Sequence, residues 1–288
     1  MKLVRFGPPG RERPGLLLDV NGSPHILDVR GMAFDIEDYN RHFFTHHGIE
    51  RVAALSREPN RKLIEASRVR LGPPIARPGK IICVGKNYAD HAREFDSVVP
   101  TSPVLFSKAT TTLIGPHDSI VVNDGDTSTD AEVELAVVIG REAVRVSESE
   151  AMHYVAGFTV LNDVTDRRAQ KEGMQWFRGK SFDTFCPMGP FLVTADELEI
   201  DRGTALRSRK NGETLQDGHT RDMIFTVPYL ISFISRSITL EPGDVIATGT
   251  PAGVGFARNP PVFLNPGDTI SCEIDGIGQL ANNVTLRS

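Results

Sequence analysis

The chain has 288 residues, of which 40% are hydrophobic and 24% are charged, and its formal net charge is −5 at neutral pH. This composition is typical of a soluble globular protein, and the length exceeds that of one typical domain. Because there is no basic excess and no long run of like charges, neither nucleic acid nor a membrane is an expected partner.

The most apolar segment, residues 224–238, is shorter than the run of about 20 apolar residues that a bilayer span requires. The first residues lack the apolar region and cleavage site of a secretory signal, so we expect a cytoplasmic protein. The three cysteines, Cys83, Cys186 and Cys272, are too irregularly spaced for a metal site. Each lies in an apolar run and is predicted to be a buried hydrophobic residue, although Cys186 could also be a nucleophile.

The first part of the chain predicts a small leading unit. Strand patterns cover residues 3–6, 15–19 and 25–28, and helical patterns cover residues 36–44 and 59–67. A stiff proline-rich segment follows at residues 71–79. We therefore expect a small N-terminal α+β domain at residues 1–75 and a larger domain at residues 76–288.

The larger part shows many short strand patterns and few helical ones. The strand patterns cover residues 80–85, 104–107, 119–122, 134–139, 156–162, 191–194, 205–210, 245–248 and 269–274. The helical patterns cover residues 91–95, 148–152, 169–172 and 227–235. Because strands and helices do not alternate regularly, the sequence predicts an α+β fold that is mainly β, with a largely antiparallel core.

A histidine and a glutamate follow the strand pattern at residues 80–85. His91 and Glu94 would lie on one helical turn, where the carboxylate can orient the imidazole as a general base. Gly85 precedes them and would allow the segment to move as a lid. An ordinary surface helix with the same spacing is the alternative interpretation.

Two lysines have unusual neighbours. Lys108 ends an apolar strand pattern, and Lys180 follows Gly179 among aromatic residues. A cation at either place can hold a substrate carboxylate or stabilise an oxyanion.

Three acidic residues lie at strand ends. With the strand period of two, Glu132 and Glu134 point to one face, while Val133 and Leu135 point to the other. A hard divalent cation between the two carboxylates would offset their repulsion, and oxygen ligands favour Mg²⁺ or Mn²⁺ over zinc. Asp163, which follows the strand pattern at residues 156–162, could complete this site. The alternatives are two exposed acids at a strand end and a helix N-cap at residues 162–163.

A strand pattern runs into a loop rich in glycine and threonine at residues 246–255. Such a loop exposes backbone N–H groups that suit an anionic ligand. It lacks the lysine of a Walker loop and the strand–helix context of a dinucleotide fingerprint, so nucleotide binding is not expected.

Five ordered motifs make residues 76–288 resemble the fumarylacetoacetate hydrolase family. They are Gly85-Lys86-Asn87-Tyr88-Ala89-Asp90-His91, Asp130-x-Glu132-x-Glu134-Leu135, Asn162-Asp163-Val164, Gly179-Lys180-Ser181-Phe182 and Thr248-Gly249-Thr250-Pro251. The leading unit is similar to the small N-terminal extension of bacterial members.

The resemblance implies a mixed β-roll, usually a homodimer, with Mg²⁺ or Mn²⁺ as cofactor and a small acid as substrate. Water would be activated from a mobile lid, and a lysine would stabilise developing negative charge. By position, the resemblance assigns metal binding to Glu132, Glu134 and Asp163, catalysis to His91, Glu94 and Lys180, and substrate contact to Lys108, Gln170 and Thr250.

The chain departs from the family pattern at one place. Members commonly read Ser-Ala-Arg-Asp after the metal-binding aspartate, whereas this chain reads Thr165-Asp166-Arg167-Arg168. The changed acid and the added base leave the substrate preference open, and the metal site is unaffected.

From the resemblance we expect hydrolysis of a C–C bond in a β-diketo acid, giving a 2-oxo acid and a carboxylic acid. The substrate would be similar to an acylpyruvate, with a 2,4-diketo-3-deoxy sugar acid as one form. Alternatives that need no activated water are decarboxylation of oxaloacetate and isomerisation of a hydroxydienoate. A further alternative is a binding protein that holds a small anion or a metal without turnover.

Overall fold

The computed structural model describes residues 1–94, 98–123, 125 and 128–287. Its largest element is a mixed sheet. The strands of this sheet are β1 (Lys2–Phe6), β2 (Arg13–Val20), β3 (Ser23–Asp28), β4 (Leu63–Glu65), β5 (Leu71–Gly72), β6 (Ile81–Gly85), β7 (Val104–Lys108), β8 (Leu113–Ile114), β11 (Val133–Ile139), β12 (Val155–Asn162), β14 (Cys186–Thr194) and β17 (Val245–Ala247). The order is β4-β3-β2-β1-β14-β12-β11-β17-β6-β7, with β5 beside β1 and β8 beside β14.

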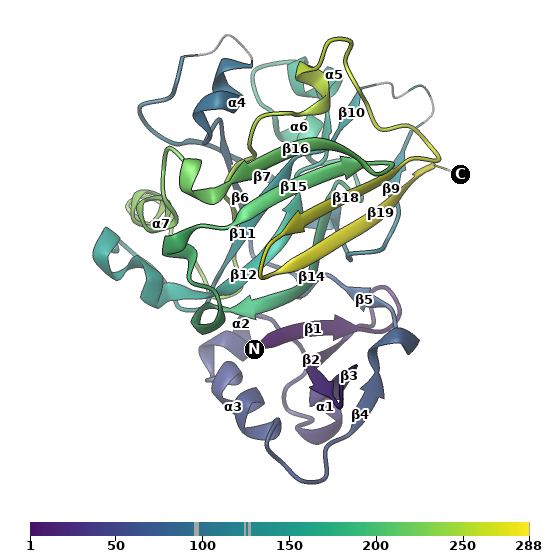
Figure 1. Ribbon diagram of the computed structural model, residues 1–288. Coiled ribbons are helices and arrows are strands. Elements are labelled where there is room, and N and C mark those ends of the chain that lie inside the picture. Colours follow the sequence, from purple (N-terminus) through teal and green to yellow (C-terminus); the bar gives the residue numbers. More distant parts are fainter. Residues whose placement is uncertain (95–97, 124, 126–127, 288) are drawn as a thin grey trace.

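A second sheet packs over the central part of the first (Figure 1). Its strands, in spatial order, are β16 (Glu213–His219), β15 (Ala205–Lys210), β18 (Thr269–Ile274), β19 (Gly278–Leu286) and β9 (Ile120–Val122). A separate two-stranded pair joins β10 (Thr129–Asp130) to β13 (Thr165–Asp166). This arrangement confirms the predicted mainly β, α+β class.

The helices are short and lie around the sheets. They are α1 (Val29–Met32), α2 (Arg41–Thr45), α3 (Gly48–Leu55), α4 (Ala89–Arg93), α5 (Arg167–Lys171), α6 (Phe177–Lys180) and α7 (Val227–Ser235). In Figure 1, α4, α5 and α6 gather at the end of the molecule opposite α1 and α3. Among the described residues, none of these helices is long and apolar enough to cross a membrane.

Strand β11 shows how the sequence pattern sets the two cores. Val133, Leu135 and Val137 pack into the cluster between the two sheets, whereas Ala136 and Val138 pack into a cluster on the opposite face. The predicted period of two is therefore confirmed along this strand. Glu134 has the parity of the second group, which places its carboxylate on the face away from the second sheet.

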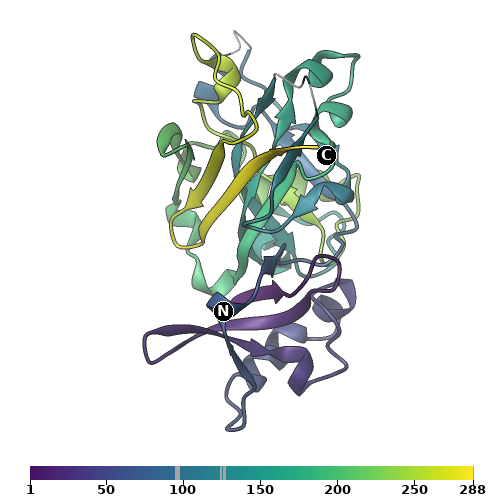
Figure 2. The ribbon, with the colours of Figure 1, turned by 90° about the vertical axis from the view of Figure 1, so that its right-hand side faces the viewer.

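The leading unit continues the main sheet. Strand β1 pairs antiparallel with β14, with Leu3 opposite Leu192. In Figure 2 the leading unit, in purple, lies directly against one end of the larger part. The apolar cluster on this face includes Leu3 and Leu16 from the leading unit together with Met188 and Leu192 from β14. One sheet and one cluster therefore span residues on both sides of the predicted boundary.

The leading unit also contains the main errors of the secondary-structure prediction. The helix predicted at residues 59–67 is wrong: β4 and a short 3-10 turn stand there, because β4 pairs with the edge of β3. The helix predicted at residues 36–44 begins later, at Arg41, because the side chain of Asn40 accepts from the N–H of Phe43 at 3.1 Å and caps α2. Helix α3 was not predicted.

Two strands of the second sheet, β16 and β19, were also missed. Both carry many polar residues: in β16 only Leu215 and Gln216 are buried, and in β19 only alternate side chains are buried. The pattern at residues 148–152 is a 3-10 helix over Glu148–Tyr154, and that at residues 91–95 corresponds to α4, with residue 95 outside the described residues.

Candidate active site

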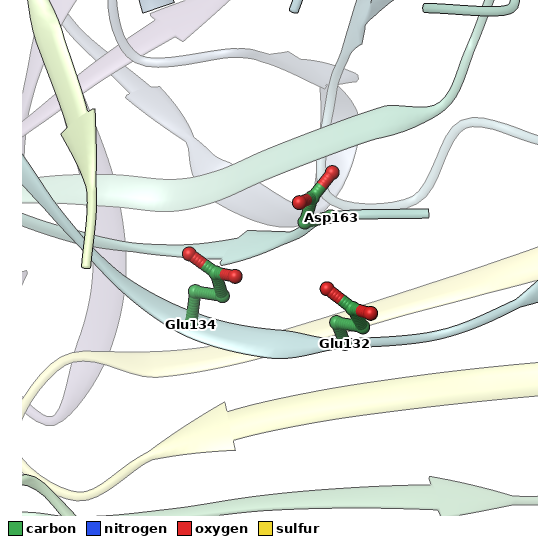
Figure 3. A group of neighbouring side chains, drawn as sticks. All are labelled: Glu132, Glu134 and Asp163. Carbon is green, nitrogen blue, oxygen red and sulfur yellow. The ribbon is translucent and has the colours of Figure 1, made fainter. Parts of the chain in front are cut away.

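The three predicted acidic ligands meet at the ends of two paired strands. Because β11 and β12 pair with Val133 opposite Asn162, Asp163, which directly follows β12, comes beside Glu132. The N–H of Asp163 donates to the carbonyl oxygen of Glu132 at 2.9 Å. Carboxylate oxygens of Glu132, Glu134 and Asp163 all lie within 4.8 Å of one another, and all three side chains are buried (Figure 3).

Two buried lysines bind this acidic triad. The Nζ of Lys180 donates to Glu132 at 2.7 Å and to Asp163 at 2.6 Å. The Nζ of Lys108 donates to Asp163 at 2.7 Å, and also to the carbonyl oxygens of Val164 and Lys180. Burial disfavours the charged form of Lys180, but the two carboxylates raise its pKa above the ordinary value, so this lysine remains a cation.

The three acids are not electrostatically equivalent. Burial opposes ionisation of Glu132, yet Lys180 and Arg167 lower its pKa well below the ordinary value. Burial, Asp163 and Glu132 all raise the pKa of Glu134. Glu134 is held by the backbone N–H of Gly249 at 2.8 Å. Burial and the two neighbouring carboxylates therefore disfavour the charged form of Glu134, and a cation bound among the three acids would relieve this repulsion.

The donor set fits a hard divalent cation. The triad offers oxygen atoms alone, close enough together for one ion, and its buried charge favours a positive partner. Mg²⁺ and Mn²⁺ prefer carboxylate ligands, so Glu132, Glu134 and Asp163 are suited to hold either ion.

The predicted histidine–glutamate pair is formed in α4. The Nδ1 of His91 lies 3.0 Å from one carboxylate oxygen of Glu94, and the other oxygen of Glu94 accepts from the N–H of Gly253 at 2.7 Å. His91 is 7% exposed and lines the same cavity as Glu132 and Glu134. The carboxylate therefore fixes the ring orientation, as a general base requires.

A buried asparagine fixes the start of this segment. The amide nitrogen of Asn87 donates to the carbonyl oxygens of Thr248 and Phe225, at 2.7 and 3.0 Å. Its Oδ1 accepts from the N–H of Phe225 at 2.8 Å. Asn87 thereby ties the residues before α4 to the loop that follows β17.

That loop corrects one prediction. Its backbone N–H groups were expected to bind an anionic ligand, but at residues 249, 253, 255 and 256 they donate to carboxylates of the protein itself. The acceptors are Glu134, Glu94 and Asp130. The hydroxyl of Thr250 donates to the carbonyl oxygen of Val133 at 2.8 Å and accepts from the amide of Gln216 at 2.7 Å.

Asp130 is a buried acid beside the triad for which the sequence motif alone predicted no role. It is 1% exposed and accepts from Nε and Nη2 of Arg167, at 3.0 and 2.7 Å. It also accepts from the N–H groups of Ala131, Gly255 and Phe256. The available signal was its position two residues before Glu132, in step with the acidic pair.

Arg167 joins this aspartate to the triad. Its Nη2 lies 2.6 Å from Glu132, and its Nη1 donates to Oε1 of Gln170 at 3.1 Å. The departure from the family pattern lies on either side of it. Asp166 caps α5 by accepting from the N–H of Ala169 at 2.6 Å, and Arg168 is exposed. Neither of these two residues is among the described residues that line the cavity.

A cavity of about 340 Å³ opens onto the triad, within the range of roughly 300–1,000 Å³ for small-molecule sites. The described lining includes six of the nine predicted site residues, and Asp163, Glu94 and Lys108 are not part of it. Asp163 accepts hydrogen bonds from Lys108 and Lys180, and Glu94 contacts the ring of His91. Lys108 is fully buried against Asp163, so its predicted substrate contact has no direct support in this arrangement. The six that line the cavity are His91, Glu132, Glu134, Gln170, Lys180 and Thr250.

The fold is a β-roll with a buried carboxylate triad beside a cavity that an oriented histidine lines. This combination is typical of an enzyme active site. The family model described as fumarylacetoacetate (FAA) hydrolase C-terminal matches residues 80–285. The chain belongs to the fumarylacetoacetate hydrolase family, and the predicted resemblance is confirmed.

Similar proteins cover the whole chain. Oxaloacetate tautomerase Fahd2a, mitochondrial, from Rattus norvegicus is 41% identical over 291 residues, which cover 99% of this chain and 91% of the rat protein. A fumarylacetoacetate hydrolase structure from Exiguobacterium antarcticum is 39% identical with a TM-score of 0.85, covering 100% of both chains. Maleylpyruvate hydrolase from Sphingobium sp., solved with manganese(II) and pyruvate, is 30% identical with a TM-score of 0.82, also covering 100% of both chains.

Proposed function

We propose that this protein is a divalent-cation-dependent enzyme that moves a proton at the carbon next to the oxo group of a 2-oxo acid. Keto–enol tautomerisation of oxaloacetate is the reaction that we propose first. The observation that carries the proposal is that His91, oriented by Glu94, shares one small cavity with Glu132 and Glu134 of the acidic triad.

Glu132, Glu134 and Asp163 would hold Mg²⁺ or Mn²⁺. When bound, such an ion supplies a Lewis acid that makes a C–H bond beside an oxo group more acidic. Lys180 and Lys108 keep the carboxylates in place by donating to Glu132 and Asp163.

His91 would transfer the proton. With Nδ1 bound to Glu94, Nε2 is the ring nitrogen that exchanges a proton with the substrate. In the keto-to-enol direction, Nε2 takes a proton from the carbon, the oxo oxygen takes a proton from water as the C=C bond forms, and Nε2 returns its proton to water. The reverse direction returns the proton to carbon, so no atom is gained or lost.

Two observations favour proton transfer over hydrolysis. Lys108 donates to three protein oxygens and does not line the cavity, and Lys180 donates to two carboxylates, so at most one ammonium N–H is left to stabilise the oxyanion that water attack creates. The rat protein named as an oxaloacetate tautomerase is also similar to this chain along its full length.

The second candidate is the predicted hydrolysis of a C–C bond in a β-diketo acid. In that reaction, His91 would take a proton from water, and the water oxygen would attack the distal carbonyl carbon. The maleylpyruvate hydrolase with bound manganese(II) and pyruvate supports this candidate, because its fold matches over the whole chain.

Parallel assays with added Mn²⁺ separate the two candidates. One assay follows decay of the enol form of oxaloacetate by its ultraviolet absorbance, and the other follows pyruvate release from acetylpyruvate. We expect fast tautomerisation that is lost in His91→Ala and retained in His117→Ala, an exposed control. Faster cleavage of acetylpyruvate would favour the second candidate, and turnover of neither acid would overturn the proposal.

A further inference from the structure

We propose that Lys171 is a specificity-determining residue that binds a second carboxylate of the substrate, so that the enzyme selects 2-oxo dicarboxylic acids over 2-oxo monocarboxylic acids. This inference rests on the proposed function, because it assumes that the 2-oxo end of the substrate lies at the acidic triad.

Lys171 is the last residue of α5 and lines the cavity that contains Glu132 and Glu134. Its Nζ lies 4.2 Å from the ring centroid of Phe256, another residue of the lining. A cation–π contact of this kind holds an ammonium group over a ring without neutralising it.

The cations of this region differ in their partners. Arg167 is paired with Asp130 and Glu132, and Lys180 with Glu132 and Asp163. Within the described parts of the chain, no carboxylate lies within ion-pair distance of Lys171. Its charge therefore remains to attract an anionic group of a ligand.

The position of Lys171 on α5 can be compared with that of Arg167, which contacts the triad. Residues 167 and 171 are four apart, so they share one face of the helix and lie about 6 Å apart along its axis, slightly more than one turn. Arg167 contacts Glu132 directly, and its guanidinium group also faces Phe256, at 5.8 Å. Lys171 thus lies about one helical turn farther along than the cation that contacts the triad, a spacing comparable to that of the two carboxylates in a short dicarboxylic acid.

Gln170 adds a second donor at this place. Its Oε1 accepts from Arg167, so its amide NH₂ is the group that can donate to a ligand. A carboxylate that reached both Gln170 and Lys171 would receive one neutral and one charge-assisted hydrogen bond.

The test compares the binding of two ligands that differ by one carboxylate. Binding of 2-oxoglutarate and 2-oxopentanoate is measured by calorimetry in the presence of Mn²⁺, for the wild-type protein and for Lys171→Gln, Lys171→Arg and Arg168→Gln. Arg168 is the matched control, because it is an exposed cation on the same helix that does not line the cavity.

We expect the wild-type protein to prefer the dicarboxylate. Lys171→Gln should weaken binding of 2-oxoglutarate about tenfold, which is the usual loss for one charge-assisted contact, and leave binding of 2-oxopentanoate unchanged. Lys171→Arg and Arg168→Gln should keep the wild-type preference.

An unchanged ratio of the two affinities in Lys171→Gln, or equal weakening of both ligands, would overturn the role of Lys171. The same holds if the wild-type protein shows no preference or binds neither ligand. Because binding needs no turnover, a wild-type protein that shows the preference but does not turn over oxaloacetate would overturn the proposed function alone.

Discussion

At the scale of single residues, Asp130 has a central position in the site. It accepts from Arg167 and from the backbone of Gly255 and Phe256, and Arg167 in turn contacts the proposed metal ligand Glu132. Residues that orient metal ligands in this way tune metal affinity without touching the ion.

Asp130→Asn should therefore weaken Mn²⁺ binding by about ten- to hundredfold, the usual effect of losing a residue that supports a ligand. The reason is that Arg167, left without its buried partner, would pull on Glu132. Calorimetric titration with Mn²⁺ measures the effect, and Asp217→Asn, at a 65% exposed side chain, is the control. Equal Mn²⁺ affinity in Asp130→Asn and in the wild-type protein would show that Asp130 does not support the metal site.

The three cysteines provide a second prediction at this scale. Burial raises the pKa of all three thiols, that of Cys186 from 9.0 to about 12. The native protein should therefore react very slowly with a thiol reagent at pH 8, and labelling should become fast only after unfolding. Rapid labelling of Cys186 in the folded protein would instead support the nucleophile considered from the sequence.

The raised pKa of the Cys186 thiol also makes the free energy of unfolding depend on pH. Below pH 9 the thiol is protonated in both the folded and the unfolded chain, so the stability that it contributes is fully present. The free energy of unfolding should then fall as the pH rises from 9 toward 12, because the unfolded chain loses this proton first.

At the scale of elements, the loop at residues 248–256 connects the metal site to the proton-transfer pair. Its N–H groups at residues 249 and 253 hold Glu134 and Glu94, respectively. Gly253 has a φ of +103°, and an added Cβ would lie 2.2 Å from the carbonyl oxygen of Leu215. The position therefore excludes larger residues for two independent reasons.

Gly253→Ala should displace this part of the loop and remove the donor of Glu94. We expect kcat for oxaloacetate to fall by about ten- to hundredfold, because a small displacement of a catalytic group is costly. Mn²⁺ affinity should change little, because Gly249 still holds Glu134. The control is Gly212→Ala, which also has a positive φ, of +87°, but lies in open space. An unchanged kcat in Gly253→Ala would show that this contact does not position Glu94.

Prediction from sequence was most accurate where local periodicity and core packing agree. The pattern at residues 227–235 is helix α7, and the alternation along β11 places Glu134 correctly. It was least accurate at β4, which pairs with a strand far away in the sequence, and at β16 and β19, whose many polar residues gave no strand pattern although each pairs with the strand directly before it.

The site shows the same division. Short spacings suggested the Glu132–Glu134 pair and the His91–Glu94 pair, and the position of Asp163 at the end of a strand pattern suggested the third acid. The partners of Asp130 and the burial of Lys108 depend on where other segments meet, which the spacing of residues does not reveal.

At the scale of the whole molecule, the leading unit and the larger part share a sheet and an apolar cluster. A chain restricted to residues 76–288 would expose the edge of β14 and the apolar residues that Leu3 and Leu16 cover. We expect this fragment to aggregate or to unfold without a cooperative transition. Circular dichroism and sedimentation test this, and a monodisperse fragment that melts like the full chain would show two independent domains.

The homodimer implied by the family resemblance stays a prediction. Sedimentation equilibrium of the full chain would test it, with a mass of twice 31.6 kDa as the expected result.

The central claim is that the triad holds a cation on which the chemistry of a 2-oxo acid depends. The most direct test measures tautomerisation of oxaloacetate after removal of metal with a chelator, and again after addition of Mn²⁺, for the wild-type protein and for Glu134→Gln. We predict that chelation abolishes activity and that Mn²⁺ restores it in the wild-type protein but not in Glu134→Gln. Full activity of the chelated protein, or equal restoration in both proteins, would contradict the claim.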